Sequence, residues 1–279
     1  MKLEQIKILF QDVDGCLNPE DGEGFGADAS WEPSANQIAM LEAIDGAVDA
    51  SHLEHFVINT GRFWPICQNF AKYLQTPKLR YFLLEHASVI YDRVEDRNLD
   101  LVQMANDCGL PDLAKRYANL DTMEQLLSWY DAEGQAAMEA IFGGNMARLD
   151  KDCNLSFDFP ANADPATVQA AIESLARESL SAEAFAQLEF CRSDSFIDVL
   201  PEITKMDGIT LLSAHLKIDL TDALAMGDYL NDLSIFETFE QVICPANAHP
   251  RIIELAQSKG PSGHVSPHSF GAALIDFLK

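Results

Sequence analysis

The stretch ILFQDVDGCLNP, residues 8–19, decides the fold and raises the first chemical question. Its apolar first half is typical of a strand buried on both faces, as parallel strands are in layered α/β proteins. The run stops at Asp12 and Asp14, two carboxylates one residue apart whose repulsion raises their pKa values. A buried strand that ends on such a pair indicates a nearby cation that keeps the carboxylates ionised.

Length and composition favour a globular protein with a substantial core. The chain has 279 residues, 48% of them hydrophobic, so one large domain or a core with an inserted module would fit. The formal net charge of -25 argues against nucleic-acid and anionic-membrane partners, because these are bound by clustered Lys and Arg, and the sequence has no such cluster. No apolar run approaches the roughly 18 residues of a membrane helix. The six cysteines are scattered singly and no signal-like segment opens the chain, which predicts free thiols and a cytoplasmic location.

Strand and helix patterns alternate at both ends of the chain and predict a parallel sheet. After the first strand, residues 18–33 are rich in Gly, Asp and Pro and are predicted to form a loop, which fits either a mobile flap over the site or a disordered surface loop. Ser34 and Gln37 form the pattern of a capping box at a helix start. LEHFVINTGR, residues 53–62, predicts a second strand, and residues 80–92 fit one strand or two short strands joined by a turn. Further strand and helix pairs begin at residue 223 and at residue 241.

The middle of the chain lacks this alternation. Helices are predicted to begin at Asp121, with Glu124 completing a capping box, and at Pro165 behind Asp164. Residues 146–160 predict strand structure, and residues 188–201 predict a hairpin that turns at Ser193-Asp194. We therefore expect an α/β core formed by residues 1–90 and 200–279, interrupted by an α+β domain of residues 91–199.

Four polar clusters lie at or near the ends of predicted strands, where open α/β sheets bind ligands. They are Asp12 with Asp14, the run Thr60-Gly61-Arg62, the single Lys205, and GDYLND with Asp228, Asn231 and Asp232. Taken alone, each has a structural explanation as a turn, a cap or a surface charge. Their joint order favours a site for a phosphate monoester.

The chemistry of these clusters fits that interpretation. Asp12 and Asp228 can share Mg²⁺, which prefers oxygen ligands. The Thr60 hydroxyl and the Lys205 ammonium can hold phosphoryl oxygens. Gly15 and Gly61 would let backbone N–H groups approach the anion closely. If a helix begins at Asp228, then Asn231 and Asp232 lie on the same face of it as Asp228.

At this point a family resemblance can be stated. DVDGCL, INTGR, Lys205 and GDYLND resemble the four signature motifs of the haloacid dehalogenase superfamily of phosphohydrolases. The second and third motifs are about 145 residues apart, which resembles the subgroup with a type II cap, including Cof-type, sucrose-phosphate and mannosyl-3-phosphoglycerate phosphatases. LLEHASVIYD and ICPANAHPRI are similar to two further segments of that subgroup. The resemblance implies a Rossmann-like three-layer core with a parallel sheet, plus an inserted α+β cap domain.

The resemblance also implies a role for each matching residue. Asp12 would be the nucleophile that forms an aspartyl-phosphate, and Asp14 the general acid and base. Thr60 and Lys205 would hold the phosphoryl group. The candidate phosphate-binding residues are Gly15, Gly61, Arg62 and Asn231. The candidate metal-site residues are Asp12, Asp14 (through its main-chain carbonyl), Asp228 and Asp232.

Three positions depart from the family pattern. His86-Ala87 replaces the usual Asn-Gly, so any family contact made there does not carry over. Lys205 is not followed directly by Gly, and Asp207 is a candidate cap for the next helix. Cys16 replaces the commoner Thr, a change between small residues.

The predicted function is that of a Mg²⁺-dependent phosphatase acting on a small phosphorylated metabolite, such as a sugar or polyol phosphate. A phosphomutase would use the same Asp12 and Asp14, and a non-catalytic binding or regulatory protein would keep the fold without turnover. A dehalogenase is disfavoured because it would not need Asp14. Candidate substrate-selecting residues in the inserted domain are Arg148, Lys151, Arg192 and Asp194, although a solvated surface charge is the favoured interpretation for each. The sequence predicts no oligomeric state.

Overall fold

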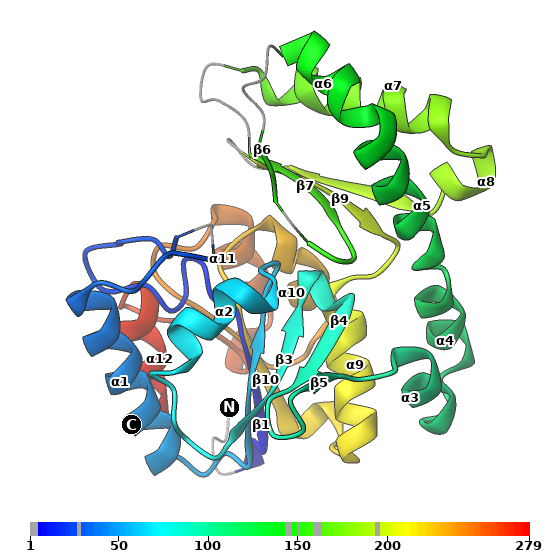
Figure 1. Ribbon diagram of the computed structural model, residues 1–279. Helices are drawn as coiled ribbons and strands as arrows, with labels where there is room; N and C mark the ends of the chain where they lie inside the picture. Colours follow the sequence, from blue (N-terminus) through cyan, green and yellow to red (C-terminus); the bar gives the residue numbers. More distant parts are fainter. Residues whose placement is uncertain (1–4, 27–28, 143–146, 150, 159–162, 193–195) are drawn as a thin grey trace. The chain divides into compact units, whose positions relative to one another are not determined.

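The computed structural model describes residues 5–26, 29–142, 147–149, 151–158, 163–192 and 196–279, and the chain forms two compact units (Figure 1). Unit 1 comprises Met1–Leu110 and Thr204–Lys279, and unit 2 comprises Pro111–Ile203. The sequence placed the boundaries at 90/91 and 199/200. Residues 91–110 belong to unit 1 because the strand at residues 97–98 pairs with the sheet of that unit and the next helix packs against one of its helices.

Unit 1 is built on an eight-stranded sheet. In spatial order its strands are β12 (Gly263–Val265), β11 (Val242–Cys244), β10 (Ala223–Met226), β1 (Ile8–Gln11), β2 (His55–Asn59), β3 (Leu79–Leu84), β4 (Val89–Asp92) and β5 (Arg97–Asn98). Pairing is parallel from β12 to β3 and antiparallel from β3 to β5. The predicted α/β fold with a largely parallel sheet is confirmed, and residues 80–92 form two strands rather than one.

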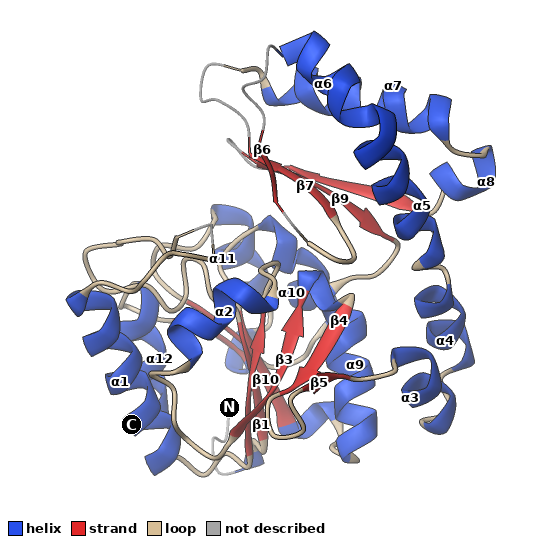
Figure 2. Cartoon of the chain, viewed as in Figure 1, coloured by secondary structure: helices blue, strands red, loops and turns tan. Residues whose placement is uncertain are grey.

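Helices lie on both sides of this sheet (Figure 2). They are α1 (Ala35–Ala50), α2 (Trp64–Ala71), α3 (Leu101–Asp107), α9 (Lys205–Leu216), α10 (Leu233–Thr238), α11 (Pro250–Ser258) and α12 (Phe270–Leu278), with short 3₁₀ turns at η2 (Glu85–Ala87), η4 (Leu220–Asp222), η5 (Leu230–Asp232) and η6 (Gly260–Ser262). α1 packs against α12, and α9 packs against α3 and α10. Every residue of β1 is buried, as its apolar sequence predicts for a strand covered on both faces.

The helix starts near the polar clusters follow from local capping. Ser34 and Gln37 form the predicted capping box of α1. α9 begins at Lys205, earlier than predicted, because Thr204 caps it and Asp207 completes a capping box from the third helical position. The 3₁₀ turn η5 precedes α10, so no helix begins at Asp228.

Unit 2 combines an antiparallel sheet with helices. Its strands, in spatial order, are β6 (Ala147–Leu149), β7 (Leu155–Asp158), β9 (Phe196–Pro201) and β8 (Leu188–Arg192). Its helical segments are α4 (Pro111–Ala118), α5 (Asp121–Trp129), the π-helical η3 (Tyr130–Gly134), α6 (Gln135–Phe142), α7 (Pro165–Ser179) and α8 (Ala182–Phe185). Asp164 caps α7 as predicted, whereas Leu120 and not Asp121 is the N-cap residue of α5, without a side-chain cap. β8 and β9 form the predicted hairpin, whose turn lies outside the described residues.

The core of unit 2 lies between its sheet and its helices. The buried apolar cluster includes Leu126 of α5, Ile172 of α7, and Leu155 and Val199 of neighbouring strands. Residues that alternate with these along the strands lie on the opposite face of the sheet, since strand side chains alternate between faces. Ser156 and Asp198 lie on that opposite face and are also buried.

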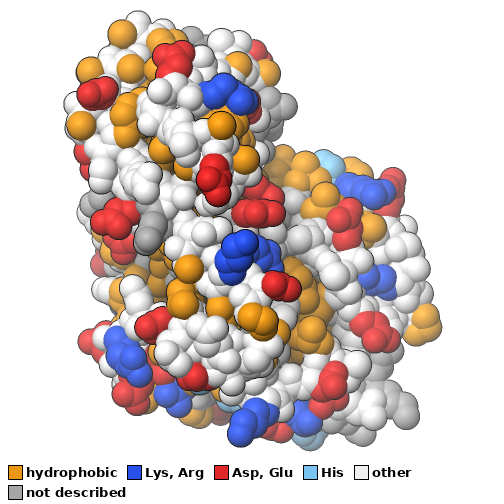
Figure 3. Space-filling view, turned by 90° about the vertical axis from the view of Figure 1, so that its right-hand side faces the viewer, with side chains coloured by type: hydrophobic (Ala, Val, Ile, Leu, Met, Phe, Trp, Pro, Cys, Tyr) orange, Lys and Arg blue, Asp and Glu red, His pale blue; other side chains and the backbone are white. Residues whose placement is uncertain are grey.

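The surface carries both signs of charge. On the face shown in Figure 3, Lys and Arg occur in small separate groups with Asp and Glu among them. Within the described part of the chain, no helix is both long enough and apolar enough to cross a bilayer.

Candidate active site

Three of the four polar clusters meet where the order of the strands reverses. β1 lies between β10 and β2, and Asp12, Thr60 and Asp228 each lie just beyond the carboxyl end of one of these strands. Backbone pairing extends past the strands, because the Asp12 amide donates to the Met226 carbonyl at 3.0 Å and the Thr60 amide to the Leu83 carbonyl at 2.9 Å. The site is therefore a reversal point of the kind where open α/β sheets bind ligands.

Lys205 reaches this site from a helix rather than from a strand of the same sheet. β9, the strand that precedes it in sequence, belongs to the sheet of unit 2, and α9 carries Lys205 at its first residue. The Lys205 Nζ lies 2.8 Å from Asp12 Oδ1 and donates to Asp232 Oδ1 at 2.7 Å, with none of its side chain exposed. Burial lowers the pKa of Lys205, but attraction to Asp12 and Asp232 outweighs it and raises the pKa, so the ammonium stays charged.

The acidic side chains form a compact cluster. One carboxylate oxygen from each of Asp12, Asp228 and Asp232 lies within 4.8 Å of the others, the one such group of three that the described residues contain. Burial, reinforced by repulsion from Asp232, raises the pKa of Asp12 well above its usual range and that of Asp228 to about 7. The single ammonium of Lys205 therefore leaves negative charge uncompensated.

This cluster fits a divalent cation. An ion such as Mg²⁺ takes carboxylate oxygens and would restore the ionised forms of Asp12 and Asp228. Gly15, at φ +72°, lets the loop close on the cluster, since a Cβ there would fall 1.9 Å from Asp228 Oδ2. Asp232 is less available as a ligand, because its Oδ1 accepts from Lys205 and its Oδ2 accepts from the Asp228 amide at 3.0 Å.

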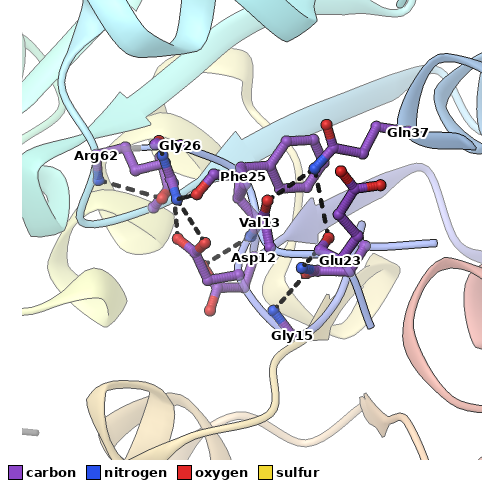
Figure 4. Close-up of polar contacts among 12 residues, drawn as sticks. Asp12, Val13, Gly15, Glu23, Phe25, Gly26, Gln37 and Arg62 are labelled. Atoms are coloured by element: carbon purple, nitrogen blue, oxygen red, sulfur yellow. Dashed lines mark hydrogen bonds and ion pairs between the residues drawn. The ribbon is translucent and has the colours of Figure 1, made fainter. Parts of the chain in front are cut away.

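Asp14 lies apart from the acidic cluster and pairs with Arg62. Its side chain is 55% exposed, and Arg62 donates to it twice, from Nε at 2.8 Å and from Nη2 at 2.7 Å. The same guanidinium donates to the carbonyls of Phe25, at 3.0 Å, and Gly26 (Figure 4). The structure thus joins Arg62, predicted to bind phosphate, to the predicted general acid and to the loop that follows β1.

The remaining predicted phosphate-binding groups differ in whether the protein already engages their hydrogen-bonding atoms. Thr60 is buried, and its Oγ1 accepts from the Arg62 amide at 3.2 Å. The Gly15 amide is already engaged, since it donates to Asn18 Oδ1 at 2.7 Å. Gly61 leaves room for a histidine, because a Cβ there would lie 2.5 Å from His86 Nε2. Asn231 Oδ1 is buried and finds no hydrogen-bond donor among the described residues.

Two features beside the site were not anticipated. Glu85, His86 and Ala87 all adopt left-handed backbone conformations, with φ of 50°, 58° and 72°, which is costly for residues other than glycine. This turn approaches α9 closely, because a Cβ on Gly208 would lie 2.4 Å from the Ala87 Cβ. The signal in the sequence was the Asn-Gly that the related motif carries in place of His86-Ala87, since Asn and Gly adopt positive φ readily.

The loop after β1 is anchored on its described residues. Phe25 is buried, and its ring centroid lies 5.4 Å from those of Trp31 and Phe70. Gln37 Nε2 donates to the Gly24 carbonyl at 2.7 Å. These contacts hold residues 23–26 against α1 and α2, so this part of the segment is not the disordered surface loop that was one of the two predicted alternatives.

The predicted substrate-selecting cations of unit 2 have acidic partners in the same unit. Arg148 Nη1 donates to Asp131 Oδ1 at 2.9 Å. Lys151 is buried rather than solvated, and its Nζ donates to Asp198 Oδ1 at 3.0 Å. The side chain of Arg192 and the residue Asp194 lie outside the described residues.

Comparison with known proteins agrees with this architecture. A family model described as haloacid dehalogenase-like hydrolase matches residues 164–263. A curated protein of Metamycoplasma hominis that is proposed to be a phosphatase is 34% identical over 74 residues, which span 24% of this chain and 26% of that protein's length.

Two solved structures cover nearly the whole chain. The crystal structure of protein 0175 of Thermoplasma acidophilum has a TM-score of 0.61 and 16% identity, covering 98% of this chain and 96% of that one. The sucrose-phosphatase of Synechocystis, solved with sucrose and phosphate, has a TM-score of 0.60 and 18% identity, covering 100% of this chain and 97% of that one. The resemblance predicted from the four motifs is confirmed: the chain has the fold of haloacid dehalogenase-like hydrolases and matches their family model over about a third of its length.

Proposed function

We propose that this protein is a Mg²⁺-dependent phosphatase that hydrolyses a small phosphate monoester through an aspartyl-phosphate. The observation that carries the proposal is the convergence of Asp12, Lys205 and Asp228 at the strand-order reversal, beside the Thr60 hydroxyl. A buried carboxylate next to a buried ammonium and a candidate cation site supplies a nucleophile and fixed positive charge for phosphoryl oxygens.

Each residue has a defined task in this reaction. An Asp12 carboxylate oxygen attacks phosphorus, and the bond from phosphorus to the ester oxygen breaks as Asp14 protonates the leaving alkoxide. Asp14, now a carboxylate, then takes a proton from the water that attacks the aspartyl-phosphate, which releases inorganic phosphate and restores the Asp12 carboxylate and the protonated Asp14. Lys205 and Thr60 hold the phosphoryl oxygens during both steps.

The metal would be held by Asp12 and Asp228, together with the main-chain carbonyl of Asp14. When bound, Mg²⁺ would offset the negative charge that the acidic cluster and the phosphoryl group bring together. Asp232 would support this site indirectly, since it orients Lys205 and the backbone of Asp228.

The proposed substrate class is a sugar or polyol phosphate. The solved sucrose-phosphatase shares the fold of this chain, and its name concerns a phosphorylated sugar. A net charge of -25 and the dispersed Lys and Arg of Figure 3 argue against a polyanionic substrate such as nucleic acid. Unit 2 would act as a cap domain that selects the leaving group.

The test is phosphate release from p-nitrophenyl phosphate and from a panel of sugar phosphates, with and without Mg²⁺. We expect turnover that requires Mg²⁺ and is abolished by Asp12→Asn. The control, Asp276→Asn, makes the same chemical change on a half-exposed carboxylate of α12 and should leave turnover unchanged. Near-normal turnover by Asp12→Asn would show that no aspartyl-phosphate forms.

The alternatives predicted from the sequence give different results in the same assay. Isomerisation of a sugar 1-phosphate without release of phosphate would indicate a phosphomutase, in which a sugar hydroxyl replaces water as the acceptor. Mg²⁺ binding without any turnover would indicate a binding or regulatory protein.

A further inference from the structure

We infer that Arg62 is a positioning residue that orients Asp14 from an anchored loop, and that it does not bind the phosphoryl group. This inference rests on the proposed function, since it concerns how Asp14 serves that reaction. It also assigns to Arg62 a task different from the one its sequence motif implies.

The hydrogen bonds of the guanidinium carry the argument. An arginine has five N–H donors in a rigid planar fork. Nε and Nη2 each donate to one oxygen of Asp14. Nη2 also donates to the Phe25 carbonyl, and Nη1 donates to the Gly26 carbonyl. These four bonds leave at most one N–H for a ligand, whereas recognition of a phosphoryl group by arginine normally uses two parallel N–H groups.

Of the two partners, Arg62 is the one that burial holds in place. Its side chain is only 13% exposed, whereas that of Asp14 is 55% exposed. Among the described residues, Arg62 supplies both hydrogen bonds that the Asp14 carboxylate accepts. Without Arg62, Asp14 would therefore rotate freely at the edge of the site and rarely reach the leaving group.

The loop carbonyls that hold Arg62 are themselves fixed. The Phe25 ring is buried against Trp31 and Phe70, and Gln37 Nε2 donates to the neighbouring Gly24 carbonyl. Because the Phe25 and Gly26 carbonyls are fixed, they fix the orientation of the Arg62 guanidinium that donates to them. The guanidinium in turn fixes the two oxygens of Asp14. The loop thus acts on the chemistry through Arg62 without touching the reacting atoms.

A double-mutant cycle tests whether Arg62 acts through Asp14. The variants are Arg62→Ala, Arg62→Lys, Asp14→Asn and the combination of Arg62→Ala with Asp14→Asn. Lys72→Ala is the matched control, because Lys72 is also a cation paired with an acidic residue just beyond this loop, Glu32, but lies far more exposed. Thermal unfolding of every variant establishes that it is folded.

Two readouts separate positioning from phosphate binding. The first is the inhibition constant of inorganic phosphate in the presence of Mg²⁺. The second is kcat/KM for an alkyl phosphate, whose leaving group needs a proton, against kcat/KM for p-nitrophenyl phosphate, whose leaving group needs it much less.

If Arg62 positions Asp14, Arg62→Ala lowers kcat/KM for the alkyl ester by about 10²-fold, the lower end of general acid–base effects, and much less for the aryl ester. The inhibition constant of phosphate then changes by less than about threefold, Arg62→Lys recovers part of the loss, and Arg62→Ala adds little to Asp14→Asn. The inference is overturned if the inhibition constant rises tenfold or more, if both esters lose equally, or if the two substitutions are additive. A wild-type protein that hydrolyses neither ester would overturn the proposed function together with this inference.

Discussion

Lys205 shows how much a single side chain can determine in this site. A lysine considered alone in a sequence is usually a solvated surface charge, yet this one is fully buried between Asp12 and Asp232. Its ammonium offsets part of the cost of burying the acidic cluster and part of the repulsion between the carboxylates. The placement of Asp12 and the stability of the core therefore depend on the same residue.

Replacement of Lys205 should affect both properties. We expect Lys205→Met to abolish turnover and to destabilise the metal-free protein by about 3–5 kcal/mol, because two buried carboxylates lose their partner. Lys7→Met removes an exposed lysine from its pair with Asp222 and should change stability far less, because solvent screens an exposed ion pair. Urea unfolding gives the free energy of unfolding of both variants. Equal losses would show that burial does not make the Lys205 ion pairs more important for stability than the exposed pair.

Asp14 should matter for rate rather than for stability. It is largely exposed, and in Asp14→Asn the buried Arg62 guanidinium keeps the new amide oxygen and the carbonyls of Phe25 and Gly26 as acceptors, so few of its donors lose a partner. We expect Asp14→Asn to lower kcat by about 10²–10⁴-fold, as general acid–base catalysis predicts, with a melting temperature close to that of the wild type. A loss of activity that merely follows a loss of folded protein would contradict this role.

The start of α9 depends on its close contact with the turn at Glu85–Ala87. Gly208 of α9 has no side chain, and a Cβ there would meet the Ala87 Cβ at 2.4 Å and Leu83 Cδ1 at 3.2 Å. Any displacement of this turn of helix would move Lys205, which begins the same helix. Packing at the turn therefore affects the position of Lys205 beside Asp12 in the candidate site.

Two helical glycines offer a matched comparison. We expect Gly208→Ala to destabilise the protein by about 1–3 kcal/mol, as overpacking does, and to lower kcat because Lys205 shifts. Gly46→Ala in α1 meets no atom within 4 Å and should stabilise the protein by about 0.5–1 kcal/mol through helix propensity, with kcat unchanged. Thermal unfolding and steady-state kinetics measure both effects. A stabilised Gly208→Ala variant would show that the contact between Gly208 and Ala87 has room for a methyl group.

The β3–β4 hairpin contains a buried carboxylate whose effect depends on pH. Asp92 accepts hydrogen bonds from Arg80 Nε on both carboxylate oxygens, each at 3.0 Å, and from Arg80 Nη2 at 2.7 Å. It also accepts from the amides of Val94 and Glu95. Burial raises the pKa of Asp92, but these hydrogen bonds outweigh it, so the pKa lies below its usual value. The unfolded state therefore binds the proton more tightly, and the stabilisation is present above about pH 4 and lost as the pH falls through the folded pKa.

Asp92→Asn should reveal this pH dependence. At pH 7 we expect it to destabilise the protein by about 1.5–3 kcal/mol, the range for hydrogen bonds to charged groups. The difference from the wild type should shrink towards pH 3, because Asp92 of the wild type is then losing its charge. Urea unfolding at both pH values measures it, and a difference independent of pH would contradict the assigned pKa shift.

The balance of charge in the metal-free chain makes cation binding part of its stability. Asp12 and Asp228 have raised pKa values because their negative charge is buried, and a divalent cation would remove that penalty. A ligand that binds only the folded state stabilises it, by about 2.7 kcal/mol at a concentration of 100 times Kd.

Mg²⁺ should therefore raise the melting temperature, and EDTA should reverse the effect. In the Asp228→Asn variant we expect most of this shift to disappear, because one of the two side-chain ligands is lost. NaCl at matched ionic strength controls for general screening. A Mg²⁺ shift of the same size in the wild type and in Asp228→Asn would place the ion elsewhere.

Much of the site could be predicted from local patterns. Asp12, Thr60 and Asp228 each follow a short apolar run, and runs of that kind form parallel strands whose ends meet at one edge of a sheet. Ser34 and Asp164 were readable as caps because a cap depends only on residues three positions away. Features of this kind need only sequence neighbours and one rule of sheet geometry.

Other features could not be predicted because they depend on residues far apart in the chain. Arg62 and Asp14 are joined across 48 positions, and whether the guanidinium is free for a ligand depends on two loop carbonyls that any sequence would supply. Likewise, the strand before Lys205 joins the sheet of unit 2, so only the packing of α9 brings its ammonium to Asp12.

The sequence alone was therefore enough to predict the α/β fold and to single out candidate site residues at the strand ends, because hydrophobic periodicity and strand ends are local properties. Packing between distant segments decided which donors remain free, which carboxylates lie close enough to share a cation and which lysine is buried. Burial and hydrogen bonding are set by every neighbour at once, and those neighbours become known only when the chain has folded.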